Sequence, residues 1–328
     1  MKALVRAESW PIRGGFRIAR GARAAADVIV VELHHEGVVG RAECVPYPRY
    51  GETLDSVRAL IEGSAEALDA RIARTQIQSM PAGAARNALD CALWDWEAKA
   101  SDTPVWSLAG LAAAPAPVRT MRTVSVASPR EMGEAAKTLA LADVIKVKVD
   151  GGADLARIAA VHVAAPSAKL VVDPNEGWSA EQTATWLPEL ADLGVVLLEQ
   201  PLPAGDDAAL DAIGERSVLI CADESFHDRG SFEQVNSRYD MINLKLDKSG
   251  GLTEALRCAE EARRLAMPMM VGCMVSTSLA IEPALLLAAG AELMDLDGPL
   301  LLENDRDGAL HDRDAGLLRP SPSVWGGA

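Results

Sequence analysis

Five charged residues recur at a nearly constant spacing in the second half of the chain. Lys148, Asp173, Glu199, Asp223 and Lys245 are separated by 25, 26, 24 and 22 positions, and each lies at or near the end of a short apolar run. Three carboxylates that converge in a half-buried cavity are costly unless a cation neutralises them. An all-oxygen ligand set predicts Mg²⁺ or Mn²⁺ rather than zinc. One such carboxylate alone is equally well explained as a helix cap or an ion-pair partner, but three at matching positions favour a metal site.

The lysines on either side of these carboxylates predict proton transfer. Lys146 and Lys148 alternate with Val147, so both point to one face of a strand. A substrate held between Lys148 and Lys245 can lose a proton to one lysine and regain it from the other on its opposite face. A hydrogen next to a carboxylate is hardly acidic, so its removal needs a nearby divalent cation. The alternative is that the lysines are surface residues that balance the acidic ones, and this applies best to Lys248.

The elements that position these residues read as repeated βα units. Short β-branched runs alternate with helical stretches rich in Ala, Leu and Glu, which is typical of a parallel sheet. A (β/α) barrel gathers the C-terminal ends of its strands into one mouth, whereas a doubly wound sheet spreads them along a line. We therefore expect a barrel whose strands are 120–126, 144–149, 169–173, 195–199, 218–223, 241–246, 269–272 and 292–295.

The first third of the chain has a different pattern. Residues 28–33 and 38–43 flank His-His-Glu-Gly and predict a hairpin, and residues 53–69 and 83–99 predict helices. The second helix is the clearer one, because its apolar residues recur at helical spacing. The run AAAPAP at 112–117 contains two prolines that cannot continue a helix, so we expect a domain boundary there.

Composition limits the class of protein. The chain has 328 residues, 49% hydrophobic and 24% charged, as in a folded globular protein large enough for a second domain. A net charge of −15 argues against a nucleic-acid partner. No stretch is long and apolar enough to span a membrane, and no secretory signal is recognisable. Five scattered cysteines without a CxxC pair argue against a disulfide framework, so we expect reduced thiols and a cytoplasmic location.

In these residues the chain resembles the enolase superfamily, in its muconate-lactonizing subgroup, and within it the dipeptide epimerases that act on L-Ala-D/L-Glu. The resemblance runs through nearly the whole chain, and its specificity lies in the order and spacing of motifs that are weak singly. They are GAARNALDCALWDWEAK, KVK, VDPN, LEQP, ADES, NLKLDKSGG and MDLDGP. A lysine base with Mg²⁺ on an ene-diolate is the general scheme of that superfamily.

The resemblance implies a fold and a reaction. The fold is α/β, a modified TIM barrel (β/α)7β at 118–302, under an N-terminal α+β capping domain at 1–117 that the tail 303–328 completes. The reaction is the interconversion of L-Ala-L-Glu and L-Ala-D-Glu in murein peptide recycling. One Mg²⁺, replaceable by Mn²⁺, is expected on the three carboxylates named above. Lys148 and Lys245 are expected to transfer the proton, with Lys146 in support, and a homo-oligomer is possible.

The same resemblance suggests how a dipeptide is held. Asp295 and Asp297 lie on one face at the end of the eighth strand and match the clamp for an α-ammonium group, with a helix cap or turn as the alternative. The distal carboxylate of the substrate needs a cation from the capping domain, for which Arg20 and Arg23 are both candidates. The remaining expected contacts are Thr123 on the dipeptide backbone, Tyr50, with Tyr47, in a closing loop, and Cys273 in the wall.

Two other functions fit the same core. An o-succinylbenzoate synthase or a cycloisomerase acts on substrates without an ammonium group, so the Asp295 and Asp297 pair disfavours it. A non-catalytic, metal-dependent binding protein is disfavoured because every core position is present.

Overall fold

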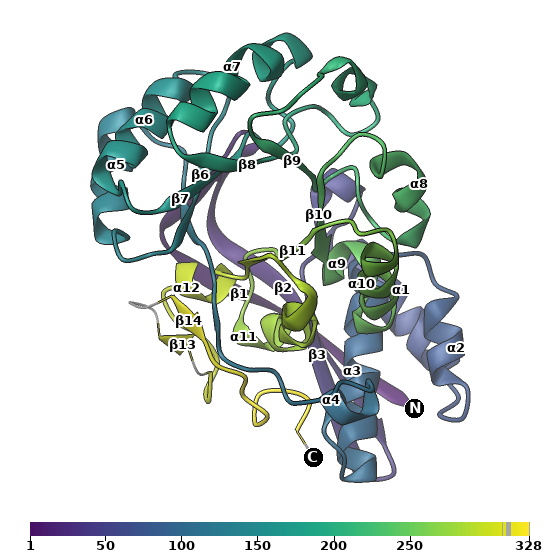
Figure 1. Ribbon diagram of the computed structural model, residues 1–328. Coiled ribbons are helices and arrows are strands. Elements are labelled where there is room, and N and C mark those ends of the chain that lie inside the picture. Colours follow the sequence, from purple (N-terminus) through teal and green to yellow (C-terminus); the bar gives the residue numbers. More distant parts are fainter. Residues whose placement is uncertain (310, 313–315, 328) are drawn as a thin grey trace.

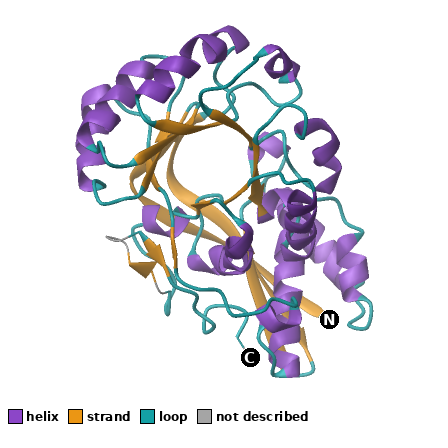
Figure 2. Cartoon of the chain, viewed as in Figure 1, coloured by secondary structure: helices purple, strands orange, loops and turns teal. Residues whose placement is uncertain are grey.

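A computed structural model of the protein describes residues 1–309, 311–312 and 316–327 (Figure 1). Eight parallel strands form a ring, and helices surround most of it (Figure 2). A three-stranded antiparallel sheet and four helices form a capping unit beside the ring. The predicted (β/α) barrel with a separate N-terminal unit is therefore confirmed. Among the described residues, no helix is both long and apolar enough to cross a bilayer.

The capping unit begins with the sheet β1 (Lys2–Ile18), β2 (Gly21–His35) and β3 (Val38–Cys44). The predicted hairpin is confirmed: His35 pairs with Val38, and the two-residue turn has φ of 50° at Glu36 and 79° at Gly37, as a tight hairpin requires. The strand β1 was not predicted, because Pro11 and a register shift between Pro11 and Phe16 interrupt its alternation. The helical elements of the unit are η1 (Pro48–Tyr50), α1 (Leu54–Glu66), α2 (Ala73–Gln78), α3 (Ala84–Ser101) and α4 (Val105–Leu108).

The barrel strands follow one another round the ring in sequence order. Three of the eight predicted strands match to the residue, and the other five are shorter by one or two residues at one or both ends. They are β5 (Arg122–Val124), β6 (Val144–Lys148), β7 (Lys169–Asp173), β8 (Val195–Glu199), β9 (Leu219–Ala222), β10 (Met241–Lys245), β11 (Met269–Gly272) and β12 (Leu293–Asp295).

The connections after the strands become less regular along the chain. Full helices follow β5, β6 and β7, whereas short helices and 3-10 turns follow most of the later strands. In order they are α5 (Pro129–Thr138), α6 (Asp154–Ala164), α7 (Ala180–Asp192), η2 (Ala208–Ala212), η3 (Arg229–Ser231), α8 (Phe232–Val235), α9 (Leu246–Ser249), α10 (Leu252–Arg264), α11 (Ser278–Ile281), η4 (Glu282–Gly290) and α12 (Gly298–Leu301). A small sheet pairs β4 (Val118–Arg119), β14 (Leu317–Leu318) and β13 (His311–Asp312).

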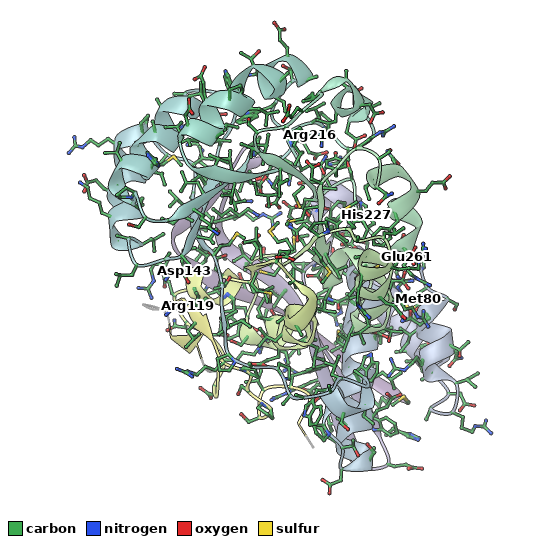
Figure 3. All side chains as sticks on the ribbon, viewed as in Figure 1. Met80, Arg119, Asp143, Arg216, His227 and Glu261 are labelled. Carbon is green, nitrogen blue, oxygen red and sulfur yellow. The ribbon has the colours of Figure 1, made fainter. Side chains whose placement is uncertain are left out.

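The interior of the ring is filled by side chains (Figure 3). One buried apolar layer contains Val171, Leu197 and Cys221. Each of these residues precedes a strand-end carboxylate by two positions, so period-two alternation points both to the same interior face. The apolar layer thus forms a dry floor, and the carboxylates lie above it at the C-terminal ends of the strands.

The C-terminal tail packs against the capping unit. Arg41 on β3 donates to the carbonyl oxygens of Ser323 at 2.9 Å and Val324 at 2.8 Å. The indole of Trp325 donates to the carbonyl of Cys91 on α3 at 3.1 Å and is buried. These contacts support our proposal that 303–328 complete the unit of residues 1–117, with 118–302 as the barrel.

Candidate active site

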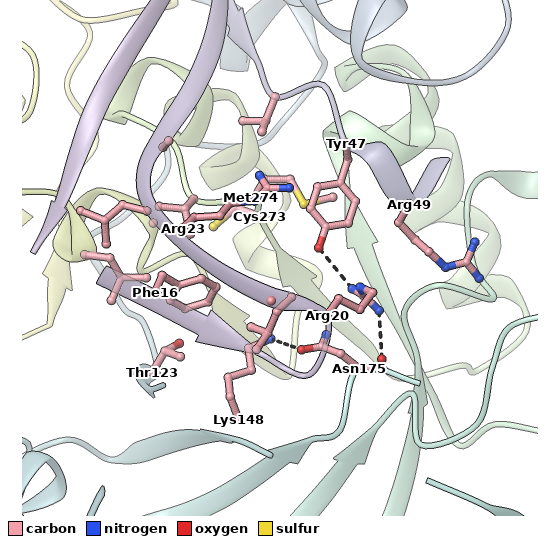
Figure 4. A pocket seen from close by; sticks show the side chains of 18 of the residues that line it. Phe16, Arg20, Arg23, Tyr47, Arg49, Thr123, Lys148, Asn175, Cys273 and Met274 are labelled. Atoms are coloured by element: carbon pink, nitrogen blue, oxygen red, sulfur yellow. Dashed lines mark hydrogen bonds between the residues drawn. The ribbon is translucent and has the colours of Figure 1, made fainter. Parts of the chain in front are cut away.

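A cavity of about 400 Å³ lies between the β1–β2 loop and the C-terminal ends of the barrel strands (Figure 4). Every predicted site residue lines it except Asp173 and Glu199, which are fully buried beneath the wall. The predicted residues in the wall are Arg20, Arg23, Tyr50, Thr123, Lys146, Lys148, Asp223, Lys245, Cys273, Asp295 and Asp297. Residues that are far apart in the sequence therefore converge, as the strand-end spacing predicts.

The two predicted proton-transfer lysines lie on strands four apart in the ring of eight. Lys148, at the end of β6, places its Nζ 2.5 Å from Asp173 Oδ2 and 3.3 Å from Asn175 Oδ1. Lys245, at the end of β10, places its Nζ 2.7 Å from Asp223 Oδ2. Both side chains line the same cavity. This arrangement can present an amine to each of two opposite faces of a bound molecule.

Lys146 lies deeper and links three carboxylates. Its Nζ is 2.6 Å from Glu199 Oε2, 2.7 Å from Asp295 Oδ2 and 3.1 Å from Asp173 Oδ2. Although burial disfavours the charged amine, the carboxylates of Asp295, Glu199 and Asp173 outweigh it and raise the pKa of Lys146 well above its ordinary value. Lys146 is therefore a fixed positive charge under the cavity.

The buried carboxylates differ in how well they are compensated. Burial raises the pKa of Glu199 above its ordinary range, and the charge of Asp173 adds to this effect. Burial also opposes the ionisation of Asp173, but the ammonium groups of Lys148 and Lys146 outweigh it and lower the pKa of Asp173. Among the described residues, Glu199 has one ammonium partner, Lys146, whereas Asp173 and Asp223 each have two.

This imbalance fits a divalent cation. Glu199 Oε2 is buried without a hydrogen bond, even though the Lys146 ammonium lies close to it. Three carboxylates in a dry interior are the hard oxygen donors that Mg²⁺ prefers. Within the described ranges, no three His, Cys, Asp or Glu side chains already form a metal cage, and lysine ammonium groups contact the carboxylates. The three carboxylates can bind such a cation when the lysine ammonium groups move away from the oxygens that they now contact.

Asp295 and Asp297 both face the cavity. Asp295 pairs with Lys146, whereas Asp297 Oδ2 accepts a 2.7 Å hydrogen bond from the backbone N–H of Thr123. Asp297 occupies the N-cap position of α12, but its side chain makes no cap hydrogen bond and is directed to Thr123 instead. Burial, together with the charge of Asp295, raises the pKa of Asp297 to about 6. The pair forms an acidic corner that can accept a cationic group.

The two candidate arginines differ in their partners (Figure 4). Arg20 is fully engaged: its guanidinium lies 2.7 Å from Glu224, 3.1 Å from Glu176 and 3.0 Å from the carbonyl of Asn175. Arg23 is exposed, and in the part of the chain that the structure describes it has no carboxylate partner. Its guanidinium lies over the Tyr47 ring, 5.2 Å from the ring centroid. Arg23 is therefore the arginine available to an anionic ligand.

The remaining predicted wall residues have defined surroundings. The Tyr50 ring packs edge-on against His227, with centroids 4.8 Å apart. Burial, and then the charges of Asp295 and Asp297, raise the pKa of Cys273, so it stays a thiol. The five cysteines form no disulfide.

Sequence reasoning missed several site residues. Asn175 contacts Lys148, and Glu224 holds Arg20. Asn243 donates to Glu199 Oε1 at 3.0 Å. Lys248, for which a surface role was open, is buried and places its Nζ 2.6 Å from Asp223 Oδ1. A usable signal existed for Asn243, which precedes Lys245 by two positions on the same strand and therefore points to the same interior face.

Comparison with protein families covers most of the chain. The family described as "Enolase C-terminal domain-like" matches residues 131–318. The family "Mandelate racemase / muconate lactonizing enzyme, N-terminal domain" matches residues 1–110.

Two relatives align over almost their whole length. The L-Ala-D/L-Glu epimerase of Escherichia coli (strain K12) is 48% identical over 306 residues, which cover 92% of this chain and 95% of that protein. The N-acetyl-D-glutamate racemase of a Pseudoalteromonas species is 39% identical over 92% of this chain and 96% of that protein.

Solved structures agree with this result. An enolase family member from Agrobacterium tumefaciens with homology to dipeptide epimerases superposes with a TM-score of 0.93 and 44% identity over 99% of each chain, and it holds sodium and L-Ala-L-Glu with an ordered loop. A dipeptide epimerase from Enterococcus faecalis V583, in complex with Mg and L-Leu-L-Tyr, superposes with a TM-score of 0.90 and 29% identity over 100% of this chain and 99% of that one.

Proposed function

The chain belongs to the mandelate racemase/muconate lactonizing enzyme family of the enolase superfamily, and on this premise we propose that it is a dipeptide epimerase. Its proposed substrates are L-Ala-L-Glu and L-Ala-D-Glu, which it interconverts by proton transfer at the carbon next to the C-terminal carboxylate. The observation that carries this proposal is the pair Lys148 and Lys245, which line one cavity from β6 and β10. Two lysines are needed because inversion removes the proton on one face and adds it on the other.

The reaction follows from these two side chains. One lysine, in its neutral form, takes the α proton as the C–H bond breaks, and the electron pair moves toward the substrate carboxylate. The other lysine, in its ammonium form, then delivers a proton to the opposite face of the same carbon. Asp173, Glu199 and Asp223 would hold one Mg²⁺, or Mn²⁺ in its place, and the cation would stabilise the negative charge that builds up on the substrate carboxylate.

The substrate class is inferred from the ends of the cavity. Asp295 and Asp297 would bind the α-ammonium group of the N-terminal residue. Arg23, which has no carboxylate partner among the described residues, would bind the side-chain carboxylate of the C-terminal Glu. Five free cysteines support a reducing compartment. We accordingly propose that the protein acts in cytoplasmic recycling of murein peptides.

The test is deuterium exchange. The protein is incubated with L-Ala-L-Glu and Mg²⁺ in D₂O, and NMR follows deuterium at the Glu α-carbon together with formation of the D epimer. We expect both in the wild type and loss of epimerisation in Lys148→Ala and Lys245→Ala. Absence of exchange at this carbon contradicts the proposal.

A parallel incubation with N-acetylglutamate separates a competing substrate class, because this molecule has no ammonium group for Asp295 and Asp297. Faster turnover of N-acetylglutamate than of L-Ala-L-Glu would overturn the dipeptide assignment. For the o-succinylbenzoate synthase or cycloisomerase alternative, Asp295→Ala should leave activity largely intact, whereas it should abolish epimerisation of a dipeptide.

A further inference from the structure

The capping helix α3 donates hydrogen bonds to the segment that follows Lys245. This segment runs through the short helix α9 and Gly250-Gly251 into the first turn of α10. Arg86 on α3 donates to the carbonyl oxygen of Gly250 at 3.1 Å and also to that of Ser249. One residue further along α3, the Asn87 amide donates to Asp247 Oδ1 at 2.8 Å. The last carbonyls of a helix lack partners within it, so Arg86 supplies donors that α9 cannot provide.

The contact between α3 and this turn is buried and closely packed. Arg86, Asn87 and Asp247 are all buried. Gly250 has φ of 80° and Gly251 has φ of 108°, a conformation that favours glycine. A Cβ atom at Gly250 would collide with the Arg86 guanidinium, and one at Gly251 would collide with Asp90. The turn therefore has little room to shift relative to α3.

The same turn carries two of the site lysines. Lys245 directly precedes α9, and Lys248 lies within it. Lys248 Nζ contacts Asp223 Oδ1 at 2.6 Å and the carbonyl of Asn243 at 3.0 Å. Lys148, in contrast, is held by Asp173 and Asn175 of the barrel. The hydrogen bonds of α3 with this turn thus lie on the Lys245 side of the cavity and not on the Lys148 side.

We propose that Arg86 and Asn87 are positioning residues that set Lys245, and not Lys148, for proton transfer. This inference rests on the proposed epimerase function, because it assigns a different role to each lysine. If the capping helix releases the turn, Lys245 moves relative to the α carbon of the substrate. A displacement of about 1 Å is enough to cost roughly a hundredfold in rate. Lys148 keeps its position, since none of its polar contacts comes from α3.

The first experiment separates the two faces of the substrate. Asn87→Ala and the charge-conserving Arg86→Lys are assayed in D₂O with each epimer of Ala-Glu separately. For the epimer whose α-hydrogen faces Lys148, exchange persists while epimerisation falls at least tenfold. For the other epimer, exchange and epimerisation fall together. Gln76→Ala is the matched control, because the Gln76 amide makes two hydrogen bonds of 2.9 Å within the capping unit and none to the turn. An equal loss of exchange and epimerisation with both epimers would overturn the inference.

The second experiment does not depend on activity. Hydrogen exchange of the backbone amides is measured by mass spectrometry in the same variants. Faster exchange is expected in residues 243–253, with no change in 144–150. Unchanged exchange in 243–253 would overturn the inference, whatever reaction the protein catalyses. A wild type that does not exchange the α-hydrogen of either epimer contradicts the proposed function instead, and the amide measurement still decides whether α3 holds the turn.

Discussion

Arg23 offers the sharpest test of substrate choice. We predict that Arg23→Gln lowers kcat/KM for L-Ala-L-Glu but leaves it nearly unchanged for L-Ala-L-Gln, which has the same shape and lacks the distal charge. An exposed Arg23 has no competing carboxylate in the described structure, so a bound Glu side chain would gain its full interaction. A hydrogen bond to a charged group contributes roughly 1.5–3 kcal/mol. At about 1.4 kcal/mol per tenfold, this corresponds to a loss of roughly 10- to 150-fold.

The matched control is Arg20→Gln. Arg20 is held by Glu224 and Glu176 of the barrel. Its loss should loosen the β1–β2 loop and therefore lower kcat/KM for both dipeptides to a similar extent. Initial rates with the two dipeptides, followed by polarimetry or NMR, give the ratio for each variant. The reasoning is refuted if Arg23→Gln affects both dipeptides equally, or if the selective loss belongs to Arg20→Gln.

Three further predictions concern pH and packing. Asp297 must be ionised to hold an ammonium group, and its pKa is about 6. Below pH 6, kcat/KM for a dipeptide should therefore fall about tenfold per pH unit. Asp297→Asn should lose this acidic limb of the pH profile. Burial raises the pKa of Glu282 from 4.5 to about 7, so the folded protein loses stability as pH rises from the lower to the higher value. Relative to the wild type, Glu282→Gln should increase the free energy of unfolding by on the order of 3 kcal/mol at pH 8 and by almost nothing at pH 4.5. A difference in unfolding free energy that does not depend on pH would contradict this. A Cβ at Gly40 would collide with backbone atoms of α3, whereas a Cβ at Gly63 on α1 would have open space around it. In thermal melts, Gly40→Ala should destabilise the protein by about 1–3 kcal/mol or more, and Gly63→Ala should stabilise it by up to about 1 kcal/mol. Equal effects of the two substitutions would count against the packing argument.

The barrel strands and their charged ends could be predicted because they depend on local patterns. A β-branched run that ends in a carboxylate or a lysine is visible in the sequence, and the barrel brings such ends together whatever connects them. The strand β1 escaped prediction because much of it is exposed and Pro11 interrupts its alternation. The short helix α2 has no capping side chain and only two buried residues, so nothing marked it.

The choice between Arg20 and Arg23 depends on contacts that no local pattern contains. The two arginines are three positions apart, Arg20 in the β1–β2 turn and Arg23 at the start of β2. What separates them is a pair of carboxylates more than 150 positions away, Glu176 and Glu224, which contact Arg20 and not Arg23. The contacts of Arg86 and Asn87 with the turn after Lys245 are equally remote in sequence. The residue types were visible in these cases, but their partners were not.

The ion pairs and hydrogen bonds of the four lysines support a division of roles among them. A lysine ammonium has three N–H donors. Lys146 donates a hydrogen bond to Asp295 and forms ion pairs with Glu199 and Asp173, whereas Lys248 donates to one carboxylate and two carbonyl oxygens, so the protein surrounds both ammonium groups with acceptors. Lys148 has two acceptors and Lys245 has one, and both line the cavity. These two amines keep a donor for a substrate, whereas neutralising the ammonium of Lys146 or Lys248 would leave a buried carboxylate without its positive partner. The contacts thus favour Lys148 and Lys245 for proton transfer and leave Lys146 and Lys248 to hold the carboxylates in place.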